Sequence, residues 1–185
     1  MRRAQRGFTL VELMVVVAIV AILGALVIGV SGRTYGANAA TMSQQLTQTL
    51  SFARTRALST RRIHRVEVHF ELSPVEIHVW QAGKTGMDRT NITVTPKLVE
   101  RTIIPSSVTL FSGIVGAQAA GALAPTQTTT QFDIDFLPNG SADVSSAGST
   151  GADAATLYLR DGNEARQYRV LVYAATGSSY ARKTW

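Results

Sequence analysis

The sequence contains no cysteine, which excludes disulfide bonds, thiol catalysis and cysteine metal sites. It also has no glycine-rich phosphate loop after a strand, no Gly-X-Ser-X-Gly segment and no metal motif of recognised spacing. We therefore expect no enzymatic activity and no cofactor. At 185 residues the chain has room for one globular core besides a terminal helix.

Charge is absent from a long stretch near the amino terminus. The 18 residues from Leu13 to Val30 carry none, and as a helix they would extend about 27 Å, close to the thickness of a bilayer core. The leader before them holds Arg2, Arg3 and Arg6, and the positive-inside rule keeps such an end in the cytoplasm. We expect this segment to span a membrane, with Glu12 at its edge in need of a partner charge.

The run Arg6-Gly7-Phe8-Thr9-Leu10-Val11-Glu12 resembles the class III signal sequence of the type IV pilin superfamily. The resemblance implies cleavage by a prepilin peptidase between Gly7 and Phe8 and methylation of Phe8. It also makes Glu12 the fifth residue of the mature chain, where pilins keep a glutamate that pairs with the terminal amine of a neighbouring subunit. The alternatives are a secretory signal removed by signal peptidase, which Glu12 and the apolar length oppose, and a plain anchor, which leaves Gly7 and Glu12 unexplained.

The chain after the apolar run reads as one helix followed by strands. Apolar residues recur at spacings of four, four, three and four on one helical face: Met42, Leu46, Leu50, Ala53 and Ala57. Alternation predicts a hairpin from 63–72 and 75–80, broken at Ser73-Pro74. Further strands are expected at 97–104, 107–111, 131–137, 156–160 and 167–173, and low-complexity loops at 113–130 and 141–155. The pattern predicts an α+β fold with an antiparallel β domain.

Three histidines, His64, His69 and His78, lie near this hairpin. A reversal at Ser73-Pro74 places His69 opposite His78 and Glu71 opposite Glu76. Opposed like charges are unfavourable, so the outer face is a solvated surface, shifts its register, or holds a divalent metal through His69, His78 and a glutamate such as Glu71.

Three later segments are similar to H-type minor pseudopilins of type II secretion and to FimT/FimU-type minor pilins. They are residues 50–58, reading Leu-Ser-Phe-Ala-Arg-Thr-Arg-Ala-Leu, residues 136–140, reading Phe-Leu-Pro-Asn-Gly, and the closing Ala175-Thr176-Gly177. The resemblance implies a long helix on two small antiparallel sheets, in a low-copy structural subunit near a filament tip. It divides the chain into a leader at 1–7, a transmembrane and assembly half-helix at 8–32, an amphipathic half at 33–62 and an outward β domain at 63–185.

The resemblance also implies partners and a location. The chain would be anchored in the bacterial inner membrane by a single pass, with its carboxy-terminal domain in the periplasm, and would then enter a periplasmic or surface filament. Expected partners are other pilin or pseudopilin subunits, the prepilin peptidase, the inner-membrane assembly platform and membrane lipid. Arginines in the acid-free stretch from Leu13 to Val66 form a solvated helix surface or meet acidic faces of neighbouring subunits, or lipid head groups in the case of Arg33: Arg33, Arg54, Arg56, Arg61, Arg62 and Arg65.

The alternative is a FimT/FimU-type minor pilin with a DNA-uptake or adhesion role. The last residues include two cations and two rings, at Tyr180, Arg182, Lys183 and Trp185, which suit base stacking and phosphate contact. The Gly-Arg-X-Arg tail of DNA-uptake pilins is missing. The formal charge of +6 falls to +3 when the three leader arginines are removed. We therefore do not expect DNA to be a partner.

Overall fold

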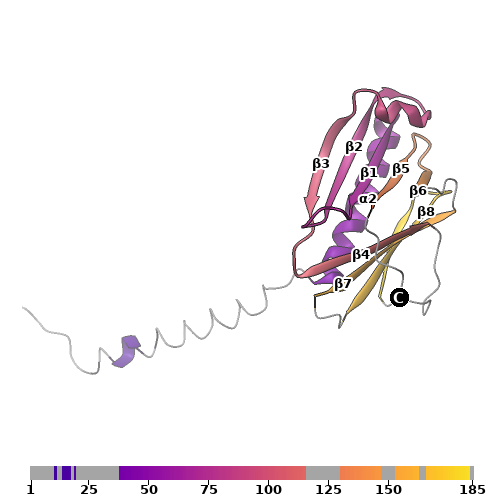
Figure 1. Ribbon diagram of the computed structural model, residues 1–185. Helices are drawn as coiled ribbons and strands as arrows, with labels where there is room; N and C mark the ends of the chain where they lie inside the picture. Colours follow the sequence, from indigo (N-terminus) through magenta and orange to yellow (C-terminus); the bar gives the residue numbers. More distant parts are fainter. Residues whose placement is uncertain are drawn as a thin grey trace, which may run out of the picture. The chain divides into compact units, whose positions relative to one another are not determined.

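The computed structural model describes residues 11, 14–17, 19, 38–115, 130–146, 153–162 and 166–183. The chain divides into two units, Met1–Gly36 and Ala37–Trp185. In the first unit the described residues are helical. The second unit carries the helix, strands and sheets that follow (Figure 1).

Helix α2 spans Ala39–Thr60. It begins where the side chain of Asn38 accepts a hydrogen bond from Thr41 N at 2.9 Å, and where Asp161 Oδ1 accepts one from Ala39 N at 2.5 Å. These acceptors satisfy amide groups that have no partner within the helix. Arg61 caps the helix after Thr60, and its left-handed φ of 53° turns the chain into the first strand. The predicted helical stretch 33–62 thus ends two residues earlier than expected, and residues 33–37 lie outside the described part.

The apolar stripe predicted for this helix is buried. Its members are at most 1% exposed: Met42, Leu46, Leu50, Ala53 and Ala57. Helix α2 contacts strands of two sheets and runs along one side of both (Figure 1). Its stripe forms one core with the inward residues of both sheets, among them Val66, Ile134 and Leu157.

Within the described residues the strands form two antiparallel sheets. The first sheet has the order β3-β2-β1-β5-β6 and the second sheet β4-β7-β8-β9. The strands of the first sheet are β1 (Arg62–His69), β2 (Glu76–Thr85), β3 (Lys97–Ile103), β5 (Gln131–Phe136) and β6 (Ala142–Ser146). Those of the second are β4 (Val108–Val115), β7 (Ala154–Asp161), β8 (Gln167–Tyr173) and β9 (Ser179–Lys183). The predicted α+β class, a helix on two small antiparallel sheets, is confirmed.

Every predicted strand is present, but two further strands were not expected. Strand β6 falls in the stretch 141–155 that the composition assigned to a loop, so that assignment is wrong for 142–146. Ala142 and Val144 are buried on either side of the half-buried Asp143, an alternation too short to stand out among serines and glycines. Strand β9, Ser179–Lys183, lies in a stretch for which no strand was predicted. In the stretch 113–130, β4 continues to Val115, and residues 116–129 lie outside the described part.

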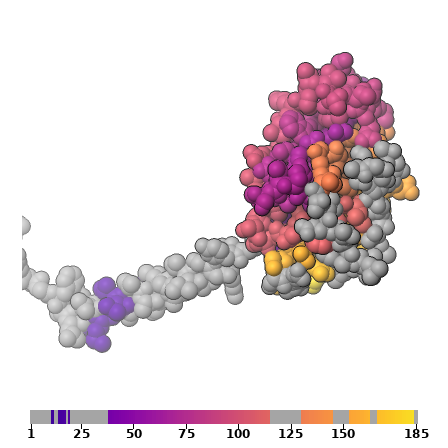
Figure 2. Space-filling model, viewed as in Figure 1, coloured from indigo at the N-terminus to yellow at the C-terminus, as the bar shows by residue number. Residues whose placement is uncertain are grey.

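A short 3-10 helix, η1 (Arg89–Thr93), contacts β1 and β2. Ile92 packs there with Ile63 and Ala82 in a second, smaller apolar cluster. Figure 2 shows this segment at the top of the view, where it covers one end of the domain. The face of the first sheet that points away from α2 is therefore partly covered.

Candidate functional site

The residues predicted for processing and assembly, Gly7, Phe8 and Glu12, lie outside the described residues. So does most of the apolar run from Leu13 to Val30. The described apolar residues of that region expose at least half of their surface, from 51% at Val16 and Ile19 to 69% at Val11. Among the described residues, no helix is both long and apolar enough to cross a membrane.

The three segments quoted for the resemblance meet at one place in the second unit. Arg54, from the end of α2, donates from Nε to the carbonyl oxygen of Gly140 at 3.1 Å. Gly177 packs against the same carbonyl, because a Cβ built there would lie 2.3 Å from Gly140 O. A Cβ on Gly140 would in turn lie 3.2 Å from Leu58 Cδ2. This junction ties the β5–β6 turn and the β8–β9 turn to the helix, so it holds both sheets in place.

Several arginines of the acid-free stretch have partners inside the chain. Besides Arg54, Arg62 donates from Nη1 to Gly83 O at 2.9 Å, and Arg56 lies over the ring of Phe52 with its Cζ 5.5 Å from the centroid. Arg65 binds aspartates, as described next. Arg33 lies outside the described residues. Arg56 and Arg61 are exposed, as expected for a solvated surface, whereas Arg54, Arg62 and Arg65 are half-buried and bind groups of this chain.

A row of charged side chains crosses the outer face of the first sheet. Arg65 donates from Nε to Asp135 Oδ1 at 2.6 Å and from Nη2 to Oδ2 at 2.9 Å. Arg89, from η1, donates to Asp135 Oδ2 at 2.9 Å and to Asp143 Oδ2 at 2.8 Å. The side chain of Asp135 is fully buried, and hydrogen bonding to it raises the pKa of Arg65. This row was missed, because an aspartate that alternates with apolar residues reads as solvent-facing.

The β1–β2 hairpin has a different register from the predicted one. Glu67 lies opposite His78 and His69 opposite Glu76, so the expected pairs of His69 with His78 and Glu71 with Glu76 are wrong. Strand β1 ends at His69, where Leu72 N donates to His69 O at 3.3 Å and starts the turn. The register differs by two residues. That change keeps the inward face and replaces opposed like charges with acid–imidazole pairs.

The hairpin nevertheless brings both histidines together. The rings of His69 and His78 have centroids 4.5 Å apart. His69 Nε2 lies 3.3 Å from Glu67 Oε2, and His69 Nδ1 lies 2.6 Å from Glu71 Oε1. His78 Nε2 lies 2.8 Å from Glu76 Oε2. Glu67, His69 and His78 each offer a ligand atom within 4.8 Å of the others. Glu67 was missed as a ligand because the predicted register placed it elsewhere; the metal itself stays a prediction.

Two further side chains fix the carboxylates around these histidines. Trp80 donates from Nε1 to Glu67 Oε2 at 2.7 Å. Arg101, on β3, donates from Nε to Glu76 Oε2 at 2.8 Å and from Nη2 to Oε1 at 2.5 Å. Hydrogen bonds from Arg101, and then from His78, lower the pKa of Glu76 to about 2. Glu76 is therefore ionised throughout the physiological range.

His64 is not part of this cluster. It is fully buried, and its Nδ1 lies 3.1 Å from Arg62 O. Among the residues that the structure describes, its Nε2 has no hydrogen-bond partner. Burial lowers the pKa of His64 below its ordinary value, with a smaller contribution from nearby arginines. His64 is therefore a neutral core residue near neutral pH.

The residues predicted as a nucleic-acid tail form part of a sheet. Tyr180, Arg182 and Lys183 lie on β9, where Arg182 pairs opposite Arg169 of β8. All three are exposed, and the ring of Tyr180 meets that of Tyr173 edge-on at 6.0 Å. Trp185 lies outside the described residues. Strand β9 places Tyr180 and Arg182 on one face of the sheet and Lys183 on the other. DNA binding itself stays untested.

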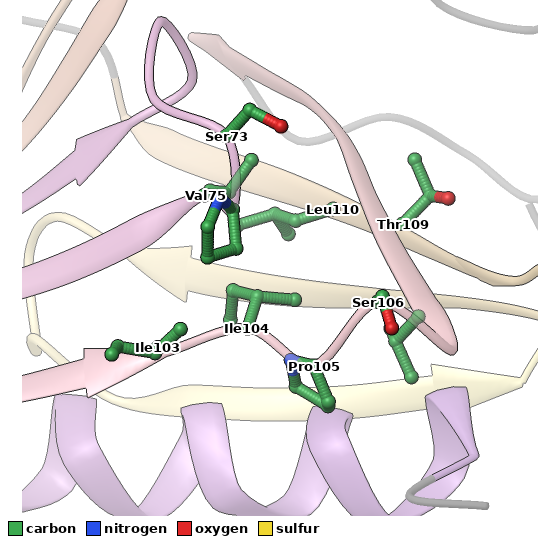
Figure 3. A pocket seen from close by; sticks show the side chains of 10 residues that line it. Ser73, Val75, Ile103, Ile104, Pro105, Ser106, Thr109 and Leu110 are labelled. Atoms are coloured by element: carbon green, nitrogen blue, oxygen red, sulfur yellow. The ribbon is translucent and has the colours of Figure 1, made fainter.

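An apolar pocket of about 560 Å³ opens between the β1–β2 turn, the end of β3 and the start of β4 (Figure 3). Its walls include Val75, Ile104, Pro105 and Leu110, and its polar groups are the hydroxyls of serine and threonine. None of the described residues lining it is an acid, a base or a histidine. This pocket therefore offers no group for proton transfer.

Comparisons with known proteins identify families that this chain resembles. A model of the prokaryotic N-terminal methylation motif matches residues 2–28, and a model of the type II transport protein GspH matches residues 42–176. The solved structure of the minor pseudopilin EpsH from the Type 2 Secretion System of Vibrio cholerae is 14% identical, with a TM-score of 0.49; the match covers 79% of this chain and 94% of that one. A search of curated proteins found no significant match.

The GspH match spans well over half of the 185 residues and includes α2 from Met42 onward, eight of the strands and the junction of Arg54 and Gly140. The expected resemblance to the type IV pilin superfamily is confirmed by both family models. The chain belongs to the GspH family of type II transport proteins, and it begins with a prokaryotic N-terminal methylation motif.

Proposed function

We propose that the protein is a minor pseudopilin, a structural subunit of the pseudopilus of a type II secretion system. The observation that carries the proposal is the order of two matches in one chain, a methylation motif at 2–28 followed by a GspH domain at 42–176. The apolar stripe of α2 is buried in the core of its own domain, whereas the described apolar residues between Val11 and Ile19 are exposed. Those residues need lipid before assembly and other subunits afterwards.

In this proposal the amino terminus is a processing and assembly site. Prepilin peptidase cuts between Gly7 and Phe8 and methylates Phe8, and the leader arginines leave with the fragment. The chain stays in the inner membrane by its apolar segment until the assembly platform extracts it. Glu12 is a carboxylate at the edge of an apolar helix, where an unpaired charge is costly. The terminal amine of a neighbouring subunit supplies the opposite charge, so Glu12 guides docking.

The junction of Arg54, Gly140 and Gly177 supports a structural role for the second unit. It fixes both sheets to the helix through the hydrogen bond from Arg54 to the Gly140 carbonyl and the close packing of Gly177 against that carbonyl. The charges of β9 do not favour the DNA-uptake alternative, since two cations on a strand give only weak, salt-sensitive phosphate binding. DNA is therefore not a partner in this proposal.

The first test is the mass of the protein from its host membrane. We expect loss of residues 1–7 and one added methyl group on Phe8. A mature terminus near Ala25 would instead identify an ordinary secretory signal and refute the proposal.

The second test uses Glu12→Ala, with Glu100→Ala as a matched loss of a carboxylate in the folded domain. Glu12→Ala should leave the membrane level of the protein normal and reduce its recovery in filament fractions, whereas Glu100→Ala should change neither. Normal recovery of Glu12→Ala in filaments would contradict the assigned role. Deleting the gene should block secretion of type II substrates and leave surface pili intact; the reverse result favours a FimT/FimU-type minor pilin.

A further inference from the structure

The outer face of β1 and β2 holds a set of side chains that the filament role does not use. Glu67 and His69 are two residues apart on β1, so they share one face, and His78 lies directly opposite Glu67 on β2. Their ligand atoms lie within 4.8 Å of one another. Both strands are interior to the first sheet, with β3 and β5 at their other sides, so the three positions are rigid.

The distances suit a tetrahedral ion. Two ligands bound at about 2.0–2.1 Å to tetrahedral zinc are roughly 3.3 Å apart. Glu67 Oε2 and His69 Nε2 are separated by 3.3 Å. A carboxylate and two imidazoles are also the protein ligands of many zinc sites, in which a fourth position stays open to water. Imidazole donors favour zinc and its transition-metal neighbours over calcium or magnesium, which prefer oxygen alone.

The ring nitrogens that face away from the ion are also bound. His69 Nδ1 contacts Glu71 at 2.6 Å and His78 Nε2 contacts Glu76 at 2.8 Å. A carboxylate on the far nitrogen orients a metal-binding histidine and makes it a better ligand. The contact with Glu76 uses His78 Nε2, so Nδ1 is the ligand atom. Arg101 holds Glu76 in place and Trp80 holds Glu67, so both carboxylates are positioned by β2 and β3.

A purely ionic face explains these contacts less well. The rings of His69 and His78 have centroids 4.5 Å apart, and each ring contacts a carboxylate of its own, Glu71 or Glu76. Those contacts leave one nitrogen of each ring for an ion between them, and they do not explain why the two rings lie together. A metal ion binds both rings at once and places a positive charge among the acidic side chains.

We propose that Glu67, His69 and His78 bind one zinc ion, which links β1 to β2 on the outer face of the first sheet. Their side chains are 15–17% exposed, so the fourth position of the ion is open to solvent. Glu71 and Glu76 are positioning residues for the two histidines. This site is independent of the assignment to a secretion filament.

The test is a calorimetric titration of the full chain in detergent, after treatment with EDTA, with zinc chloride and in parallel with calcium and magnesium chloride. We expect one equivalent of zinc to bind far more tightly than either other ion. Glu67→Gln, His69→Gln and His78→Gln should each weaken zinc binding at least about tenfold, and Glu71→Gln by about 10–100-fold. Glu100→Gln is the control, because Glu100 lies near Gln45 and Phe52 of α2, on the other face of the sheet.

Two further measurements distinguish the loss of a zinc ligand from misfolding of the variant. Circular dichroism should show every variant folded in EDTA. Zinc should raise the melting temperature of the wild type and of Glu100→Gln, but not of His69→Gln or His78→Gln. With cobalt in place of zinc, the visible spectrum should be that of four-coordinate cobalt bound to nitrogen and oxygen. Zinc binding no tighter than calcium, or unchanged in the histidine variants, would overturn the proposal.

Discussion

Replacing Asp135 by alanine should be among the most damaging single changes in the second unit. The side chain is fully buried and accepts three hydrogen bonds, two from Arg65 and one from Arg89. If all three charge-assisted hydrogen bonds were simply lost, at about 1.5–3 kcal/mol each, the free energy of unfolding would fall by roughly 4.5–9 kcal/mol. The arginines keep part of their binding, because Arg89 still contacts Asp143 at 2.8 Å and Arg65 still lies 3.5 Å from Asp133. Breaking a buried pair in this way costs about 3–5 kcal/mol, the value we expect.

The measurement is urea unfolding at pH 7 of the chain from Ala37 onward, which is a compact unit of its own. A loss of about 3–5 kcal/mol should also lower the melting temperature by roughly 6–20 °C. Asp133→Ala is the matched control, since Asp133 is 21% exposed and meets Arg65 only at 3.5 Å; it should cost less than about 1 kcal/mol. If Asp135→Ala costs no more than this control, the buried row does not stabilise the sheet and the reasoning fails.

Two further changes test the core and the junction. Gly177 has a φ of 62°, and an added Cβ would lie 2.3 Å from Gly140 O, so Gly177→Ala should lower the free energy of unfolding by at least about 2 kcal/mol. The control is Gly162→Ala, whose added Cβ would lie 3.5 Å from the nearest atom, and which should lower it by less than about 1 kcal/mol. Equal losses in the two variants would contradict the close packing at Gly177. The pKa of His64 is lower in the folded chain than in the unfolded chain, where a histidine titrates near about 6.5. The neutral side chain therefore contributes fully to the free energy of unfolding above that pH, and this contribution is lost as the pH falls below it. His64→Gln should therefore flatten the fall in unfolding free energy between pH 7 and 5, by at most about 1.4 kcal/mol per pH unit; an unchanged slope would show that His64 does not titrate there.

The helix and most strands follow from the spacing of apolar residues. Leu46 and Leu50 are one turn apart and both are buried, and Val66 and Val68 alternate with polar residues and face the core. Such periods depend only on local geometry, so they can be recognised before any tertiary contact is known. Strand β6 was missed because its alternation covers a single polar residue, Asp143, within a stretch of small residues.

The register of the hairpin could not be predicted in the same way. A shift by two residues returns every side chain to the same face, so Val66 and Val68 stay buried in either register. What separates the registers is the pairing on the outer face, where Glu67 meets His78. The length of the turn after His69 decides this, and a six-residue turn leaves no clear signal in the sequence.

The buried row was missed for a related reason. Asp135 alternates with Ile134 and Phe136, so its type alone assigns it to solvent. Its burial depends on Arg65 from a neighbouring strand and on Arg89 from η1, which is 46 residues away along the chain. The burial of Asp135 can therefore be predicted only when the order of the strands in the sheet is known.

The order of strands has a consequence for how the domain gains and loses its structure. The chain builds three strands of the first sheet, crosses to the second for β4, returns for β5 and β6, and leaves again for β7, β8 and β9. Strand β5 pairs with β1 across more than sixty residues, as Arg65 opposite Asp135 shows. Neither sheet is a continuous piece of chain, because β4 interrupts the first and β5 and β6 interrupt the second, and both sheets share one apolar core with α2. Folding therefore waits for contacts between distant segments, which slows it, and unfolding proceeds as one cooperative transition without a stable half-domain.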